Sequence, residues 1–321
     1  MVYYSDKDGI SSGASGDLQI DTRLARAMIC SFGMDDEIGI KNYVNMKKKN
    51  LLLMVVIASF AILNFTALNA KTIYYVKVNR IGNGTSWANA AGNIQEMIDK
   101  AVAGDEVWVA AGTYYPTAGE SISKSFNLKK GVNLYGGFAG NETGVTNRTK
   151  SDKDSNGKTE AWEFTNETIL SGKISNNENC LAVVTLSGSY ENYPIFDGFT
   201  VMNGVRGIIV EGNSTVNNCI ICDNGNNEGG NSDEWSGCGI ENKGAIVSNS
   251  KITNNKAYFR TPYRYYASNY SIQGGGIYNS GTVINCIITN NRCEIYDTWG
   301  HLSVDANGGG IGRCSGKTHN T

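Results

Sequence analysis

The clearest pattern in the chain is a short alternation of apolar and polar residues that recurs three times in its second half. In each block an isoleucine stands three residues before a closing asparagine. The blocks are 215–224, with Ile221 and Asn224, 246–255, with Ile252 and Asn255, and 282–291, with Ile288 and Asn291. A second motif, Gly-x-Gly-Ile, separates and follows the blocks at 237–240, 274–277 and 308–311. Alternation with a period of two, interrupted by glycine and asparagine corners, predicts short β-strands.

The way these strands repeat predicts the fold class. The spacing between blocks varies and no ten-residue helical pattern falls between them, so alternating βαβ units and a leucine-rich horseshoe are disfavoured. We expect an all-β protein in which each strand pairs in parallel with its equivalent one turn later, a right-handed parallel β-helix or solenoid. Inward positions then stack in columns, one made of the three isoleucines and another of Cys219, Ser250 and Cys286.

Two structural expectations follow from the stacking. Cys219 and Cys286 are separated by one intervening turn, and two strand spacings of about 4.8 Å exceed the reach of a disulfide, so both are expected to be small buried fillers. The asparagines at 224, 255 and 291 fall in register at a corner, where asparagine tolerates a positive φ and stacked amides can hydrogen bond along the axis.

The two ends of the repeat region differ. Residues 87–102 place Ile94, Met97, Ile98 and Ala101 on one helical face, with Gly104 beyond, so a short N-terminal helix is expected to cap the solenoid within a capping region of about 71–115. Strands are expected at 106–110, 131–135 and 168–170.

No helix or polar cap follows Ile311, so the C-terminal end of the β-helix domain, residues 71–321, is expected to be incomplete.

The first seventy residues are not expected to belong to the mature protein. Met46 is followed by three lysines, by the apolar stretch 51–68 and then by Ala70, which is the order of a secretory signal peptide spanning 46–70. Residues 1–45 are interpreted as a mispredicted upstream extension. An uncleaved signal anchor is the alternative, because the apolar stretch approaches the length that spans a bilayer.

Composition narrows the function classes. The chain has 321 residues and a formal net charge of −2, with 28 Lys+Arg and 30 Asp+Glu, and no long basic run, so nucleic acid is not an expected partner. Its 39 glycines and 3 prolines show no collagen period. Of its 8 cysteines, seven follow the leader, an odd number for an exported protein, so one thiol at least has no partner within the chain.

Several motifs together carry a family resemblance. They are 74–77 (YYVK), 84–89 (GTSWAN), 104–114 (GDEVWVAAGTY), 134–143 (LYGGFAGNET) and the Gly-Gly-Gly-Ile turns. With the leader, they resemble exported β-helix proteins of the Bacteroidetes type, which are related to chlamydial polymorphic outer membrane protein repeats and share the pectin-lyase-like superhelix. The resemblance covers 71–314. It implies a secreted, cell-surface or outer-membrane protein, often with a C-terminal sorting or anchoring domain that would be the contact with the membrane.

One acidic segment has metal-ligand spacing. Residues 152–163 match the spacing of an EF-hand calcium loop, with Gly157 at the turn and Glu160 placed to act through water; the expected ligands are Asp152, Asp154, Asn156, the Lys158 carbonyl and Glu163. Flanking amphipathic helices are missing, so an isolated Ca²⁺ loop that ties down an insertion is the prediction. The alternative is a solvated acidic loop without metal.

An aromatic insertion is the second candidate for binding. Residues 256–273 are rich in tyrosine, and aromatic faces stack on sugar rings, so Tyr258, Tyr263, Tyr265 and Tyr266 are candidates for a glycan-contact loop. The alternative is that these rings pack on the flank of the solenoid.

No catalytic set is predicted. Polysaccharide hydrolysis needs two opposed carboxylates, and lyase chemistry needs a base near a cation. Asp197, Asp223, Glu211 and Glu241 lie in or near the repeats, but no basic partner recurs beside them in the sequence. We therefore expect a non-enzymatic, adhesin-like surface protein that binds a polysaccharide or a host or surface glycoprotein. The alternatives are a polysaccharide-active lyase or hydrolase, and a spacer without ligand.

Overall fold

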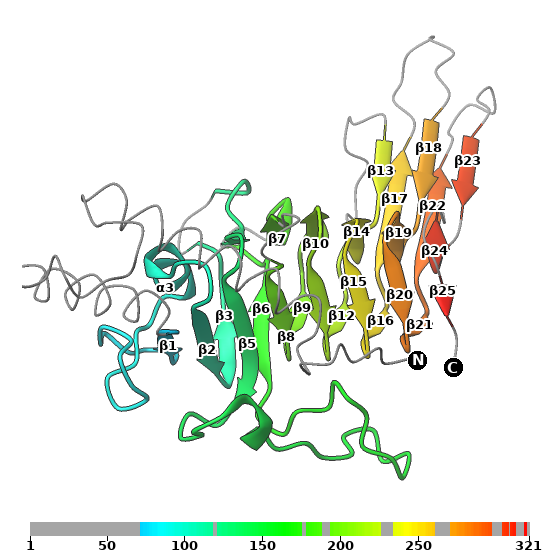
Figure 1. The fold of residues 1–321 in the computed structure, drawn as a ribbon. Coiled ribbons are helices and arrows are strands. Elements are labelled where there is room, and N and C mark those ends of the chain that lie inside the picture. Colours follow the sequence, from blue (N-terminus) through cyan, green and yellow to red (C-terminus); the bar gives the residue numbers. More distant parts are fainter. Residues whose placement is uncertain are drawn as a thin grey trace, which may run out of the picture. The chain divides into compact units, whose positions relative to one another are not determined.

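A computed structural model describes residues 71–117, 121–174, 178–187, 193–225, 234–260, 270–296, 304–307, 309–312 and 318–319. Most of its strands belong to three parallel sheets that the chain visits in turn (Figure 1). Sheet 1 contains β1 (Ile73–Val76), β2 (Glu106–Ala110), β5 (Asn133–Phe138), β8 (Ile195–Asp197), β11 (Thr215–Asn217), β15 (Ile246–Ser248), β20 (Thr282–Ile284) and β25 (Thr318–His319). Sheet 2 contains β3 (Gly112–Tyr114), β6 (Thr168–Ser171), β9 (Thr200–Met202), β12 (Ile220–Cys222), β16 (Lys251–Thr253) and β21 (Ile287–Thr289). Sheet 3 contains β4 (Phe126–Leu128), β7 (Ala182–Ser187), β10 (Arg206–Glu211), β14 (Ile240–Lys243), β19 (Ile277–Asn279) and β24 (Ile311–Gly312).

From β2 to β24, each turn of the chain adds one strand to each sheet. β11, β12 and β14 form one turn, and they pair in parallel with β15, β16 and β19 of the next turn. This arrangement is a parallel β-helix, so the predicted fold class is confirmed.

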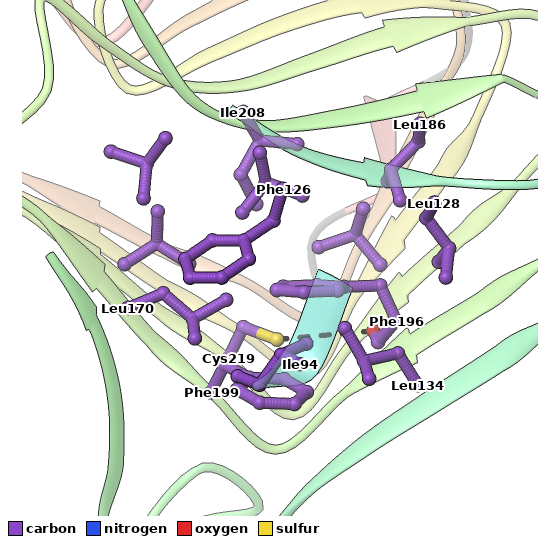
Figure 2. Close-up of a cluster of buried hydrophobic side chains, with 14 of the residues drawn as sticks. Ile94, Phe126, Leu128, Leu134, Leu170, Leu186, Phe196, Phe199, Ile208 and Cys219 are labelled. Carbon is purple, nitrogen blue, oxygen red and sulfur yellow. Dashed lines mark hydrogen bonds between the residues drawn. The ribbon is translucent and has the colours of Figure 1, made fainter. Parts of the chain in front are cut away.

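The core lies inside the three sheets. Ile221 pairs with Ile252, which pairs with Ile288, as the repeat predicts. Figure 2 shows large apolar side chains from different sheets meeting in this interior, among them Leu170, Phe196 and Ile208. Cys219 is fully buried among them with its Sγ 3.9 Å from the carbonyl oxygen of Phe196, and none of the cysteines in the described part of the chain forms a disulfide. The prediction that Cys219 and Cys286 are not joined is confirmed.

The predicted asparagine ladder exists at the corner after sheet 2. Asn224 Nδ2 donates to Asn255 Oδ1 at 3.0 Å, and Asn255 Nδ2 donates to Asn291 Oδ1 at 2.9 Å. A positive φ at these three positions is a wrong prediction: the residues with φ above zero stand one position earlier, Asp223, Asn254 and Asn290. The chain therefore turns first, and the turn directs the next side chain inward, where it can join the ladder.

The glycine motif fits against this ladder. A Cβ on Gly239 would lie 2.9 Å from Asn255 Nδ2 and 2.3 Å from the carbonyl oxygen of Gly276. A Cβ on Gly276 would lie 2.8 Å from Asn291 Nδ2. The backbone of the following turn thus passes too close to the amides for any side chain, which explains why glycine recurs before the isoleucine of each turn.

The expected short N-terminal helix lies within 87–102. Helix α3 spans Ile94–Lys100, and Asn93 caps its start by accepting a hydrogen bond from the Glu96 N–H at 3.1 Å. Ile94, Met97 and Ile98 are buried in the core, where the helix packs on β1, β2 and β4. Strand β2 has the expected bounds, β5 begins two residues later and ends three residues later than expected, and β6 is one residue longer than expected.

The aromatic insertion is built differently from the loop expected at 256–273. It begins with β17 (Lys256–Arg260) and ends with β18 (Tyr270–Gln273). β17 pairs with β22 (Arg292–Tyr296), and β18 pairs with β13 (Glu234–Ser236) and β23 (Val304–Asn307), so adjacent turns extend outward as small parallel sheets (Figure 1). Tyr263, Tyr265 and Tyr266 lie outside the described residues, as do the side chain of Tyr258 and the leader at 46–70.

Within the described part of the chain, no helix has the length and apolar character needed to cross a membrane.

Candidate functional site

The candidate site is carried by a long insertion between β5 and β6, residues 139–167, which includes a short 3-10 helix at Val145–Asn147. One buried ion pair fastens this insertion to sheet 1. Arg148 Nη1 lies 2.7 Å from Asp197 Oδ1, and both side chains are under a tenth exposed. The contact is an ion pair without regular hydrogen-bond geometry, while Asp197 Oδ2 accepts from the amides of Asn217 and Asn218 at 2.7 Å each.

Aromatic rings surround the Arg148 guanidinium. Its Cζ lies 4.5 Å from the ring centre of Phe164 and 5.4 Å from that of Phe138, both within the range of cation–π attraction. Arg148 Nη1 also donates to the carbonyl oxygen of Gly136 at 2.8 Å. The first and last parts of the insertion are therefore held on the body of the β-helix, and the acidic loop between them has a fixed base.

The acidic loop brings three carboxylates together. One oxygen from each of Asp152, Asp154 and Glu163 lies within 4.8 Å of the others. Asp152 Oδ2 accepts from the Gly157 N–H at 2.8 Å, and its Oδ1 accepts from the Asn156 N–H at 3.2 Å. These backbone donors orient the carboxylate within its own loop, so the three groups form a cluster that could hold a metal ion.

Glu163 is the inner member of the cluster. It is only 3% exposed. Burial would raise the pKa of this carboxyl, but hydrogen bonds from the backbone N–H groups of Glu160 and Lys153 outweigh it and hold the pKa below its ordinary value. Glu163 is therefore ionised at neutral pH, as a metal ligand must be.

Two lysines lie beside the carboxylates. Lys251 Nζ, on β16 of sheet 2, lies 3.9 Å from Asp154 Oδ2, and its side chain is 31% exposed. Lys153 Nζ lies 3.5 Å from Glu167 Oε2, and Glu167 in turn accepts from the Thr200 hydroxyl of β9 at 2.7 Å. The loop thus lies against the outer face of sheet 2, where carboxylates and ammonium groups share one solvent-accessible region.

The structure places the five predicted ligands as follows. Asp152, Asp154 and Glu163 come together. Asn156 Oδ1 accepts from the Lys158 N–H at 2.8 Å and Asn156 Nδ2 donates to Glu160 Oε1 at 3.0 Å, so this amide is engaged within the loop. Ligation by Asn156 and by the Lys158 carbonyl stays a prediction.

Sequence reasoning missed the basic partners of the carboxylates. Asp197 pairs with Arg148, and Glu241 pairs with Arg206 at 3.3 Å and with Lys243 at 2.9 Å. Arg206 and Glu241 come from neighbouring turns, and Lys251 is far from Asp154 in the sequence. The absence of basic partners was thus a wrong prediction: Lys243 lies two residues from Glu241 on β14, and the other partners come from a neighbouring turn or from the insertion and share no common spacing.

The buried cysteines are unsuited to nucleophilic chemistry. Burial raises the pKa of the Cys180 thiol to about 12 and that of Cys219 to about 12. A thiol with such a pKa stays protonated at neutral pH, and the thiolate is the reactive form. These side chains serve as core fillers.

Comparisons with known proteins give little beyond the fold. No protein-family model and no curated protein matches the chain. Among solved structures, the chain is similar to the crystal structure of pectate lyase Pel9A, with 16% sequence identity and a TM-score of 0.40 over 73% of this chain. The match covers 52% of that protein, so the chain spans about half the length of the structure it resembles.

This likeness bears on one prediction from the sequence. We expected the chain not to be an enzyme, whereas the solved structure it matches is that of an enzyme. The prediction of a non-enzymatic protein is contradicted by this finding and is not retained.

Proposed function

We propose that the chain acts on acidic polysaccharides as a Ca²⁺-dependent lyase, with its site between the acidic loop and sheet 2. The observation that carries this proposal is the position of the Lys251 ammonium beside Asp154, whose carboxylate clusters with those of Asp152 and Glu163. A cation site next to a basic side chain is the arrangement that proton abstraction beside a carboxylate requires.

The donor set suits calcium. Ca²⁺ prefers hard oxygen ligands and tolerates flexible geometry, and three carboxylates oriented by backbone N–H groups offer such ligands. Two of the three, Asp152 and Asp154, are exposed, so the carboxylate of a sugar can approach the same point. When bound, calcium would draw electron density from that sugar carboxylate and make the adjacent C–H bond more acidic.

Lys251 is the residue to which we assign the role of base. Its amine takes the proton from the carbon next to the sugar carboxylate. The electron pair of that C–H bond forms a C=C bond, the bond to the neighbouring sugar's oxygen breaks, and that oxygen takes a proton from water. Lys153 is placed to hold a second anionic group of the substrate, because its side chain is about a third exposed next to the loop.

The proposed location follows from the leader. A signal peptide at 46–70 would export the chain to the cell surface, the outer membrane or the medium, where acidic polysaccharides are available. Kinship with exported Bacteroidetes-type β-helix proteins and with chlamydial repeats is part of the same proposal.

The experiment is an assay of the full chain on polygalacturonate and alginate, with Ca²⁺ or with EDTA. We expect unsaturated oligosaccharides, detected by their ultraviolet absorbance, to form only with Ca²⁺. The variants Asp154→Ala and Lys251→Ala should lose this activity, whereas Lys100→Ala should keep it, because Lys100 pairs with Glu96 on the exposed face of α3. Absence of unsaturated products with both substrates, or activity that survives Asp154→Ala, would contradict the proposal.

A further inference from the structure

A groove of about 410 Å³ lies where sheet 2 ends and the outward strands β17 and β22 begin. It is separate from the acidic loop. Its lining comes from two consecutive turns of the β-helix: Asn254, Asn255, Lys256, Asn290, Asn291 and Arg292.

The groove repeats the same chemistry on each turn. Lys256 and Arg292 are directly opposite each other in the β17–β22 ladder. Beside them, the hydroxyls of Thr253 and Thr289 lie 3.3 Å apart. Strand neighbours are about 4.8 Å apart, so the groove presents a cation and an amide at one level and the same two kinds of group one strand further, while the threonine hydroxyls belong to the adjoining strands β16 and β21.

Four asparagines line the groove. Asn255 and Asn291 belong to the scaffold of the fold, whereas Asn254 and Asn290 do not. Asn255 and Asn291 form the buried ladder. Asn254 and Asn290 are exposed, with φ of 57° and 56°, and neither side-chain amide has a hydrogen bond within the described residues. These two amides are therefore able to bind a ligand without breaking the fold.

The charge of the groove is positive. Glu294 Oε2 lies 2.6 Å from Lys256 Nζ, and its Oε1 lies 3.5 Å from Arg292 Nη1. One carboxylate thus bridges two cations and leaves a net charge of +1 for the three groups. The Arg292 side chain is 72% exposed, so its guanidinium can reach an anion from solvent.

We propose that this groove is a binding subsite for an acidic saccharide chain, which lies across the strands so that successive sugars meet successive turns. Cations select the carboxylates, and the amides and threonine hydroxyls accept and donate to the sugar hydroxyls. The inference rests on the proposed function and extends it, because the groove lies just beyond the end of β16, the strand that carries Lys251.

The test is calorimetric titration of the full chain with hexagalacturonate in EDTA at low ionic strength. The groove needs no metal, so we expect binding under these conditions, and a lyase assay that fails would leave this result unaffected. Arg292→Ala and Asn290→Asp should each weaken binding by about tenfold, which corresponds to about 1.4 kcal/mol. Asn290→Asp is the variant most certain to fold, because Asp223 occupies the equivalent corner one turn before Asn254 with a φ of 54°.

Two further variants sharpen the test. Glu294→Gln should tighten binding, because it removes the negative charge beside Lys256 and Arg292. Arg80→Ala, which removes an exposed arginine near the N-terminal helix, should leave the affinity unchanged. No heat in EDTA, equal affinity for a neutral hexasaccharide, equal affinity for an oligonucleotide of the same charge, or variants that bind like the parent would each overturn the proposal.

Discussion

Glu163 differs from the other two carboxylates of the acidic loop because it is buried while they are exposed. Its two oxygens accept from backbone N–H groups at both ends of the loop, from Lys153 at 3.2 Å and from Glu160 at 2.9 Å. Glu163 therefore has two roles: its hydrogen bonds hold the loop closed, and its negative charge would attract a cation.

Replacing Glu163 with glutamine should weaken Ca²⁺ binding by at least about tenfold, because affinity in such loops depends on the number of charged ligands. Calorimetric titration of the full chain with Ca²⁺ measures the effect. Glu96→Gln, on the exposed face of α3, is the control and should bind Ca²⁺ like the parent chain. A parent chain that releases no heat, or a Glu163→Gln chain with unchanged affinity, would show that the loop is not a calcium site.

The lowered pKa of Glu163 also predicts a pH effect in the absence of metal. A carboxyl whose folded pKa lies below its unfolded value of about 4.3 contributes stability above that value and loses it as the pH falls through the folded pKa. The melting temperature of the parent should therefore fall below about pH 4 more steeply than that of Glu163→Gln. Parallel melting curves for the two chains over this range would contradict the expectation.

The Arg148–Asp197 pair should matter more for folding than any surface ion pair. Asp197→Ala would leave the guanidinium buried without its counter-charge, and removing one partner of a buried pair costs about 3–5 kcal/mol. Denaturant unfolding measures the loss. Lys100→Ala breaks an exposed ion pair and should lower the unfolding free energy by less than about 1 kcal/mol. Equal losses of unfolding free energy in the two variants would contradict the greater importance of the buried pair.

At the scale of elements, the asparagine ladder holds the corner of successive turns together. The Asn255 amide donates to Asn291 Oδ1 and to the Ile221 carbonyl oxygen, and its Oδ1 accepts from Asn224 Nδ2. Asn255→Ala would leave these buried groups without partners, at about 1–3 kcal/mol for each group left unsatisfied. Thr289→Ala, which removes an exposed hydroxyl of the same sheet, should change the unfolding free energy by less than about 0.5 kcal/mol.

Elements with a local signal were predictable from the sequence. The isoleucine column and the asparagine ladder follow from residues that repeat in register, and β2 follows from a continuous apolar run. Helix α3 was predicted only to lie within 87–102, because apolar spacing alone does not reveal that Asn93 supplies the cap. The strands β17 and β18 were missed, because the segment containing them was read as an insertion.

At the scale of the whole molecule, the site is harder to predict than the fold. The spacing of Asp152, Asp154 and Glu163 is visible in the sequence because one short loop holds all three. Lys251 comes from β16, and it reaches Asp154 only because the insertion is fastened to sheet 1 by Arg148 and lies across sheet 2. Such a contact depends on how an irregular insertion packs on a regular solenoid, and no periodicity encodes it.

The central claim is that a calcium ion on the acidic loop and Lys251 act on the same sugar. The most direct measurement is a crystal structure of the full chain carrying Lys251→Ala, grown with Ca²⁺ and tetragalacturonate so that the substrate stays intact. We predict a calcium ion about 2.3–2.6 Å from oxygens of Asp152, Asp154 and Glu163, with a sugar carboxylate as a further ligand beside position 251. Calcium bound elsewhere, or a sugar bound away from the acidic loop, would contradict the account.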